Sequence, residues 1–302
     1  DALRIMLDSA GVASGDEVIT TAFTFVASAE TIVQTGASPV FVDIVPATYN
    51  IDPDKIEAAI TPRTKAIMPI HLFGQMCDME PIERIASRHG LAILEDAAQA
   101  LACRHKGRPA GKWGQSAALS FYVTKNLGAA GDGGMILTDH DEVAEKSRSM
   151  RVHGMGRERY YYDHVGYTSR MHEIQAAVLH VKFQRLADWN ARRSAIAELY
   201  LNLLQDSGIA LPVTSDGNSH TWHQFCIRHT RRDELQSFLK ERGVDSMIYY
   251  PVPLHHHAPY RRFAAEGLGE TERAAREILS LPIHPHLSDA QVRHVCQCLL
   301  EF

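Results

Sequence analysis

The sequence predicts an α/β protein with a mostly parallel central sheet, helices on both faces of that sheet and a smaller C-terminal α+β domain. Strand-like and helix-like segments alternate through residue 150, and several strand-like segments are continuously apolar, which is typical of strands covered on both faces. A turn-rich segment at 212–219 precedes a second series of elements. We therefore expect a large domain at 1–187 and a small one at 188–302, which includes the linking helix.

The first half of the chain supplies the elements of the large domain. The expected strands are residues 18–21, 39–44, 66–72, 91–94, 117–123 and 135–138. The expected helices are residues 1–10, 27–34, 52–60, 82–88 and 141–150. Gly36 ends the second helix, and Asp52-Pro53 offers an N-cap followed by a proline at the first helical position. In such sheets, ligands bind beyond the carboxyl ends of the strands.

In the second half of the chain, the spacing of apolar residues changes. Apolar residues recur at helical spacing from 173 to about 204. After the turn-rich segment we expect a strand at 225–227, a helix at 233–242 ended by Gly243, and a strand at 247–250. A helix at 270–279 and a final helix from Ser288 complete the small α+β domain.

Composition excludes several classes of function. A net charge of −5 gives no electrostatic footprint for nucleic acid, and no apolar run approaches the roughly 20 residues that span a bilayer. Five cysteines without metal or disulfide spacing suit reduced thiols, so we expect a cytoplasmic protein. The run His255-His256-His257 is the obvious metal candidate, but consecutive residues do not share a helix face. We therefore expect a loop there and no metal.

Lys125 stands between the apolar run at 117–123 and a glycine-rich loop at 128–134. A partly desolvated lysine has a lowered pKa and can attack a carbonyl to form a Schiff base. Taken alone, an ordinary surface lysine is the better explanation, because lysine is costly to bury. The predicted sheet favours a functional role, because Asp96 also follows a strand end and is expected in the same cleft.

The combination of Lys125, Asp96, Ser120 and a nearby aromatic residue fits pyridoxal 5′-phosphate. That cofactor needs a lysine for its aldehyde and an acid that keeps its pyridine nitrogen protonated. The glycine loop contains neither of the common nucleotide-phosphate motifs. Each residue alone also has a structural explanation, such as a helix cap for Asp96.

Several spaced motifs resemble the DegT family of sugar aminotransferases. They are Gly15-Asp-Glu-Val-Ile-Thr-Thr, Phe23-Thr-Phe-Val-Ala, Glu95-Asp-Ala-Ala-Gln-Ala, Ser120-Phe-Tyr-Val-Thr-Lys-Asn-Leu-Gly, Gly131-Asp-Gly-Gly, Gly166-Tyr with Glu173-Ile-Gln-Ala-Ala, and Tyr249-Tyr-Pro-Val-Pro-Leu-His. They occur in order along the whole chain. The resemblance implies the fold-type-I, aspartate-aminotransferase-like architecture of pyridoxal-phosphate enzymes and a homodimer with shared active sites.

The resemblance also implies roles for single residues. Lys125 matches the Schiff-base lysine that also moves the proton, and Asp96 matches the partner of the pyridine nitrogen. Gln99 matches the residue at the ring's phenolic oxygen, Ser120 a phosphate-binding serine, and Phe25 the aromatic residue that packs on the ring.

Two positions depart from the family pattern. Members commonly carry Gly-Thr or Gly-Ser just before the position of Asp1, at a helix start whose amides hold the cofactor phosphate. Either the given sequence is a piece of a longer chain, or this part of the phosphate site is missing. Thr168 replaces an asparagine that in the family reaches the partner subunit's phosphate, although its hydroxyl can still donate.

The resemblance implies transfer of an amino group, from glutamate, to a keto carbon of a nucleotide-linked sugar. The stretch from Thr124 to Gly134 resembles members that act on 3-keto sugars, so a dTDP-linked 3-keto-6-deoxy sugar is the expected substrate. A 4-keto sugar is the alternative. A related dehydratase is disfavoured because such members lack the lysine. A catalytically silent regulatory protein on the same fold is the alternative from another class.

Overall fold

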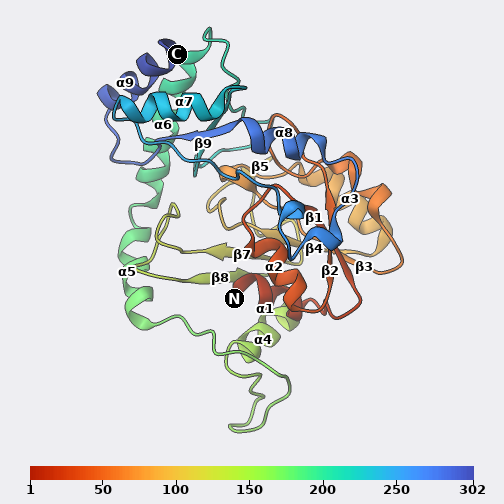
Figure 1. Cartoon of the computed structure of the whole chain (residues 1–302). Helices are drawn as coiled ribbons and strands as arrows, with labels where there is room; N and C mark the ends of the chain where they lie inside the picture. Colours follow the sequence, from red (N-terminus) through yellow and green to blue (C-terminus); the bar gives the residue numbers. More distant parts are fainter.

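The computed structural model describes residues 1–302, and its centre is a sheet with strand order β2-β1-β3-β4-β7-β8 (Figure 1). All neighbouring strands are parallel except β8, which pairs antiparallel with β7 at one edge. The strands are β1 (Glu17–Thr21), β2 (Ser38–Val42), β3 (Thr64–Ile67), β4 (Ala92–Asp96), β7 (Ser116–Ser120) and β8 (Gly134–Leu137). The predicted α/β class with a mostly parallel sheet is confirmed.

Helices cover both faces of this sheet. Val18 of β1 and Leu94 of β4 belong to a buried cluster that includes α1 and α2. Their neighbours Ile19 and Ile93 belong to a second cluster that includes α3. Because successive side chains point to opposite faces of a strand, α1 and α2 cover one face and α3 covers the other. The bounds are α1 (Ala2–Ser9), α2 (Ala27–Gln34), α3 (Met79–His89) and α4 (Asp141–Met150).

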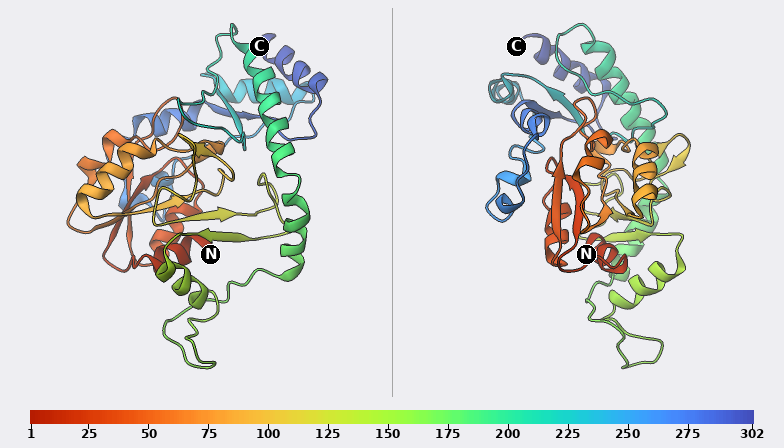
Figure 2. Two further views of the ribbon diagram at one scale, coloured as in Figure 1. Left: turned by 180° about the vertical axis from the view of Figure 1, so that it is seen from behind. Right: turned by 90° about the vertical axis from the view of Figure 1, so that its right-hand side faces the viewer.

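The C-terminal part of the chain has its own core. Nineteen buried residues, all between Ile196 and Leu299, join one long helix to an antiparallel strand pair and two further helices (Figures 1 and 2). The elements are α6 (Leu186–Leu204), β9 (Phe225–Arg228), α7 (Arg232–Glu241), β10 (Ile278–Leu281) and α9 (Asp289–Leu300). The exact division of the domains at residue 187 stays a prediction.

One C-terminal segment packs against the large sheet instead. Leu254 and Tyr260 lie in a buried cluster with Ala22 and Phe41, and α8 (Gly269–Glu277) contributes to a cluster around Phe23. Three short 3₁₀ turns lie in or beside these contacts, namely η3 (Leu72–Gly74), η4 (Leu254–His256) and η5 (Arg261–Phe263). Residues from the first and the last third of the sequence therefore lie together at the carboxyl edge of the sheet.

Some predicted elements were wrong in type. Residues 52–60 form two 3₁₀ turns, η1 (Pro53–Lys55) and η2 (Glu57–Ala59), and no α-helix. The Asp52 side chain does cap the first turn. However, Pro62 disfavours the helical backbone conformation at the residue before it, Thr61, so a longer helix cannot continue through this position. The predicted helix at 270–279 ends at Glu277, because the apolar residues that follow pair with β9 as strand β10.

Other predictions were wrong in extent. The helical period from 173 to 204 is divided into α5 (Glu173–Phe183) and α6. In the predicted strand at 247–250 only Met247 forms a bridge, with Ser280. β3 and β7 end at Ile67 and Ser120, earlier than expected. A small hairpin of β5 (Arg104–His105) and β6 (Arg108–Pro109) was not predicted.

α5 lies at the rim of the molecule, near the end of the β7–β8 pair, and the loop between α4 and α5 projects away from the rest of the chain (Figures 1 and 2). Its tyrosines 160–162 are exposed. None of the helices has both the length and the apolar composition needed to cross a bilayer.

Candidate active site

The predicted site residues follow three parallel strands at one edge of the sheet. Asp96 ends β4 and Ser120 ends β7, and these strands pair in parallel with Asp96 opposite Ala118. Phe25 comes after β1, which runs in the same direction. The carboxyl ends of parallel strands meet at one edge, so the fold brings these side chains together as expected.

The Asp96 carboxylate is buried, with 4% of the residue exposed. The Ser28 hydroxyl donates to one of its oxygens at 2.8 Å, and the Ala98 amide donates to the other at 3.1 Å. The Ser28 hydroxyl also lies 3.1 Å from that of Thr24. Neutral donors therefore fix the carboxylate on both oxygens. A buried carboxylate held only by neutral donors is suited to a cationic group of a ligand.

Lys125 follows β7 after a short turn. The Tyr122 amide donates to the Ser120 hydroxyl at 3.3 Å, and the Lys125 amide donates to the Tyr122 carbonyl at 2.8 Å. Burial lowers the pKa of the Lys125 amine below its ordinary value of 10.5, and the nearby Asp96 carboxylate partly opposes that shift. The amine therefore loses its proton more readily than a solvated lysine, which makes it a better nucleophile.

Gln99 and Tyr250 form the aromatic side of the site. The Gln99 side chain accepts from the Phe73 amide at 2.7 Å and donates to the Tyr250 hydroxyl at 3.1 Å. The Tyr250 ring centroid lies 6.3 Å from that of Phe25. Phe25 is 57% exposed, which is unusual for a phenyl ring and leaves its surface free for a flat ligand.

The residue after Lys125 connects the site to the C-terminal part of the chain. The Asn126 amide donates to the Thr221 carbonyl at 2.8 Å and to the Asn190 side chain at 2.9 Å. Its oxygen lies 3.2 Å from Nδ1 of His223. Burial, reinforced by the positive charge of Lys125, holds the pKa of His223 well below its ordinary value, so this imidazole stays neutral.

The glycine loop after Lys125 is braced by α5. The Gln175 side chain accepts from the Ala130 amide at 2.8 Å. A Cβ atom on Gly131 would lie only 2.9 Å from the nitrogen of the same side chain, so glycine permits this close approach. The Lys182 ammonium donates to the Gly128 carbonyl. Two α5 side chains therefore hold the loop in place.

Glu95 is a structural neighbour of the site. It is fully buried and accepts from the amides of Gly111, Trp113 and Gly114 at 2.9–3.0 Å. Its remaining partner is Nε2 of His71, at 2.9 Å. Because protein groups occupy its oxygens, Glu95 stabilises the loop after β6, whereas Asp96 next to it remains available to a ligand.

Thr168 does not join this cluster within the chain. It is exposed in the loop between α4 and α5, and its hydroxyl lies 3.2 Å from Nε2 of His153. Its neighbours fasten the loop to α1, since the Tyr167 hydroxyl donates to Asp8 at 2.5 Å and the Ser169 hydroxyl donates to Asp1 at 2.7 Å. The expected contact with a partner subunit's phosphate stays a prediction.

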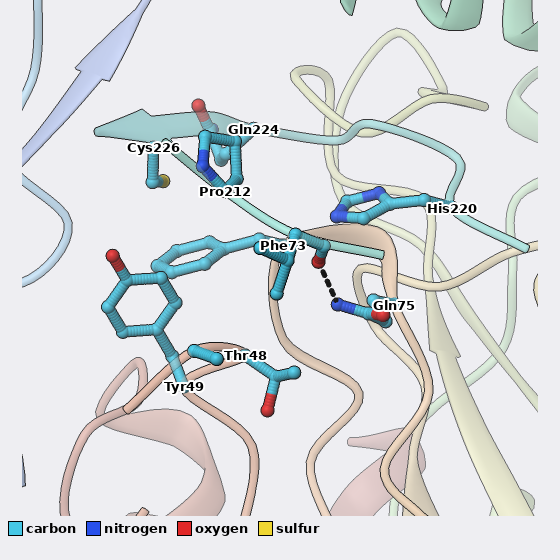
Figure 3. A pocket seen from close by; sticks show the side chains of 10 residues that line it. Thr48, Tyr49, Phe73, Gln75, Pro212, His220, Gln224 and Cys226 are labelled. Carbon is cyan, nitrogen blue, oxygen red and sulfur yellow. Dashed lines mark hydrogen bonds between the residues drawn. The ribbon is translucent and has the colours of Figure 1, made fainter. Parts of the chain in front are cut away.

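A small cavity lies beside the site and not in it (Figure 3). Tyr49, Phe73 and Gln75 line it from the large part of the chain, and the segment from Pro212 to Cys226 covers it. The Gln75 side-chain amide donates to the Val213 carbonyl at 3.0 Å and so fixes the covering segment over the cavity. The cavity of about 10 Å³ has room for one water molecule, too little for a cofactor or a sugar.

The donor set at the sheet edge fits pyridoxal phosphate. A buried carboxylate whose hydrogen bonds come only from neutral donors suits a protonated pyridine nitrogen, and a lysine of lowered pKa suits an aldehyde. The exposed Phe25 ring offers a flat contact. Sequence reasoning missed Ser28, Tyr250 and the Asn126 contacts. Tyr250 and Asn126 belong to motifs named above and Ser28 does not, but the contacts of all three join positions that are distant in the sequence.

The DegT/DnrJ/EryC1/StrS aminotransferase family matches residues 1–300 of the chain. A Geobacillus stearothermophilus protein named pleiotropic regulatory protein is 52% identical, over 100% of this chain and 82% of its own length. A Streptomyces venezuelae dTDP-3-amino-3,4,6-trideoxy-alpha-D-glucose transaminase is 45% identical over 100% of this chain and 80% of its length. A Pseudomonas aeruginosa UDP-2-acetamido-2-deoxy-3-oxo-D-glucuronate aminotransferase is 42% identical over 99% and 83%.

A solved structure matches equally well. The crystal structure of S. venezuelae DesV in complex with a ketimine intermediate has a TM-score of 0.96 and 44% identity, covering 100% of this chain and 82% of that one. These matches confirm the family, fold and cofactor that the sequence motifs implied. The chain belongs to the DegT/DnrJ/EryC1/StrS aminotransferase family, which includes pyridoxal-phosphate-dependent enzymes that aminate nucleotide-linked sugars.

Proposed function

We propose that this protein transfers the amino group of glutamate to the C3 keto carbon of a dTDP-linked 6-deoxy sugar. The observation that carries the proposal is a lysine of lowered pKa near a buried carboxylate, Asp96, whose hydrogen bonds come only from neutral donors, at the carboxyl edge of the sheet. The names of the relatives from S. venezuelae and P. aeruginosa both place the reacting group at C3, with dTDP in one case and UDP in the other.

Each predicted residue has a place in this proposal. Lys125 would hold pyridoxal phosphate through its aldehyde, Asp96 would meet the pyridine nitrogen, and Phe25 would contact the ring. Ser120 and a donor from the partner subunit, Thr168, would hold the phosphate. When bound, the cofactor supplies an electron-accepting ring that stabilises negative charge developing at the α-carbon of the amino donor.

The role of Lys125 follows from its environment. Burial favours the neutral amine, so Nζ can accept a proton from the α-carbon of glutamate. The same atom, once protonated, returns a proton later in the cycle. The Asn126 contacts to Asn190 and Thr221 fix the turn that carries the lysine. We therefore assign the proton transfers of the reaction to this one atom.

Asp96 acts through its charge and its fixed orientation. The Ser28 hydroxyl and the Ala98 amide keep both carboxylate oxygens in place before any ligand binds. Preorganised charge in a buried site stabilises a charged transition state without reorganisation. Gln99, whose oxygen is used by the Phe73 amide, has one N–H left for the phenolic oxygen of the cofactor.

The proposal includes a homodimer. On α5, Ile174 is 76% exposed and Val181 is 67% exposed, and they lie at helical spacing on one side of the helix. Leu179 is the only buried residue of α5. The neighbouring loop adds the exposed tyrosines 160–162 and Val165. An apolar surface of this extent next to the predicted partner-contacting Thr168 suits a subunit interface.

A catalytically silent regulatory protein is the second candidate, because the relative with 52% identity carries a regulatory name. A visible absorbance scan of the purified protein separates the two, since a silent relative need not hold pyridoxal phosphate. Five free cysteines, all buried, suit the cytoplasmic location that we include in the proposal.

The substrate is tested by a screen of nucleotide-linked keto sugars with glutamate, in which the release of 2-oxoglutarate is measured. A dTDP-linked 3-keto-6-deoxyhexose should give a higher kcat/KM than its 4-keto isomer. The reason is geometric, since a misplacement of about 1 Å can cost on the order of a hundredfold in rate. NMR of the product identifies the carbon that carries the new amino group. Amination of the 4-keto isomer at an equal or higher kcat/KM would overturn the proposed preference for the C3 keto carbon. Preference for a UDP-linked 3-keto sugar would overturn the assignment of dTDP as the nucleotide but not the assignment of C3 as the aminated carbon.

A further inference from the structure

The histidine run at residues 255–257 lies close to a carboxylate from another element. His255 and His256 end η4, and Glu272 lies in the first turns of α8. Nε2 of each histidine is 3.4 Å from the same oxygen of Glu272, and one possible ligand atom from each residue lies within 4.8 Å of the others. The sequence predicted no metal here, because consecutive residues do not share a helix face; the run itself does not show that Glu272 lies beside it.

The distances fit coordination better than they fit hydrogen bonds. A hydrogen bond between these groups would normally be about 2.7–3.2 Å long. Zn²⁺ binds histidine nitrogen and carboxylate oxygen at about 2.0–2.2 Å, so neighbouring ligands of a tetrahedral ion lie roughly 3.3–3.5 Å apart. Both distances to the Glu272 oxygen fall in that range.

His255 provides a second, independent observation. The residue is 95% buried, because only 5% of its surface is exposed, and its Nδ1 atom has no hydrogen-bond partner. Its other nitrogen has only the long contact to Glu272. A buried imidazole nitrogen without a good hydrogen-bond partner requires an explanation, and an ion bound at Nε2 would supply the partner that this nitrogen lacks.

The surroundings also favour a cation. The Asp43 carboxylate accepts from the amides of Glu270 and Thr271 at 2.9 and 2.8 Å, so a second negative charge lies at the start of α8. His256 and Glu272 have side chains that are 50% and 41% exposed, which gives an ion a path from solvent.

We propose that His255, His256 and Glu272 bind a divalent transition-metal ion, of which Zn²⁺ is the representative. Two imidazoles and one carboxylate suit such an ion, and water from the open side would complete its coordination. The ion would join η4 to α8 and so fix the segment that follows Tyr250, a residue of the active site. Hard ions such as Mg²⁺ and Ca²⁺, which prefer oxygen ligands, would not compete.

The test uses the untagged, full-length protein loaded with pyridoxal phosphate. Equilibrium dialysis against a chelator-buffered Zn²⁺ series, with zinc measured by atomic emission, should show one tight site per chain. His256→Gln and Glu272→Gln should each weaken that site at least about tenfold, because each removes a direct ligand. Both side chains are half-exposed, so the variants should fold, which cofactor absorbance and Tm without zinc will check.

His257→Gln is the matched control. It removes an imidazole from the adjacent exposed residue, which is not part of the cluster, and should leave zinc affinity unchanged. Zinc should also raise the Tm of the wild type and of His257→Gln but not that of His256→Gln. The proposal is overturned by absence of a stoichiometric site, by wild-type affinity in His256→Gln or Glu272→Gln, or by an equal loss in His257→Gln.

Discussion

Asp96→Asn should reduce turnover about a thousandfold while leaving the fold intact. An asparagine keeps an oxygen that can accept from the Ala98 amide, and its side chain can still bond the Ser28 hydroxyl. What disappears is the negative charge, which lies in a position only 4% exposed and so is little screened. Two unit charges about 4 Å apart interact with about 4 kcal/mol at an effective dielectric constant of about 20. That energy corresponds to about a thousandfold in rate.

The matched control is Ser28→Ala. It removes one hydrogen bond to the carboxylate but keeps the charge and the bond from Ala98, so turnover should fall no more than about tenfold. Both variants are assayed for kcat with glutamate and a keto-sugar acceptor, and for cofactor content by visible absorbance. The reasoning about charge is refuted if Asp96→Asn stays within about tenfold of the wild type, or if Ser28→Ala loses as much activity as Asp96→Asn.

Three further predictions concern the lysine and the assembly. Borohydride reduction of the holoenzyme followed by peptide mapping should place the pyridoxyl group on Lys125, and a label on any other lysine would disprove the assignment. Because a lowered pKa enriches the neutral amine, uptake of pyridoxal phosphate by the apoenzyme should accelerate with pH and level off below 10.5; levelling only above that value would contradict the burial effect. By light scattering, the double variant Ile174→Asp, Val181→Asp should be monomeric. The control Leu300→Asp, at a position that is also exposed (59%) but lies on α9, should stay dimeric. A dimeric double variant would exclude this face of α5 as the interface.

Much of the site could be predicted because its residues are defined by short motifs at strand ends. Asp96 and Ser120 end β4 and β7, and parallel strands deliver such residues to one edge whatever the details of packing. The fold class was predictable for the same reason, since continuously apolar strands alternate with amphipathic helices. Ile278 and Leu279 were assigned wrongly to the preceding helix, because an apolar stretch at a helix end has the same composition as a short buried strand.

The contacts that position the lysine could not be predicted in this way. Asn126 bonds Asn190, 64 positions away, and Thr221, 95 positions away, and neither pair shows a periodicity or a motif. Buried polar groups must find partners, but the sequence alone does not say which ones. Because both partners of Asn126 lie beyond residue 187, the predicted small domain holds the turn that carries Lys125. The active site therefore depends on how the two parts of the chain pack together, and a motif within either part describes only half of it.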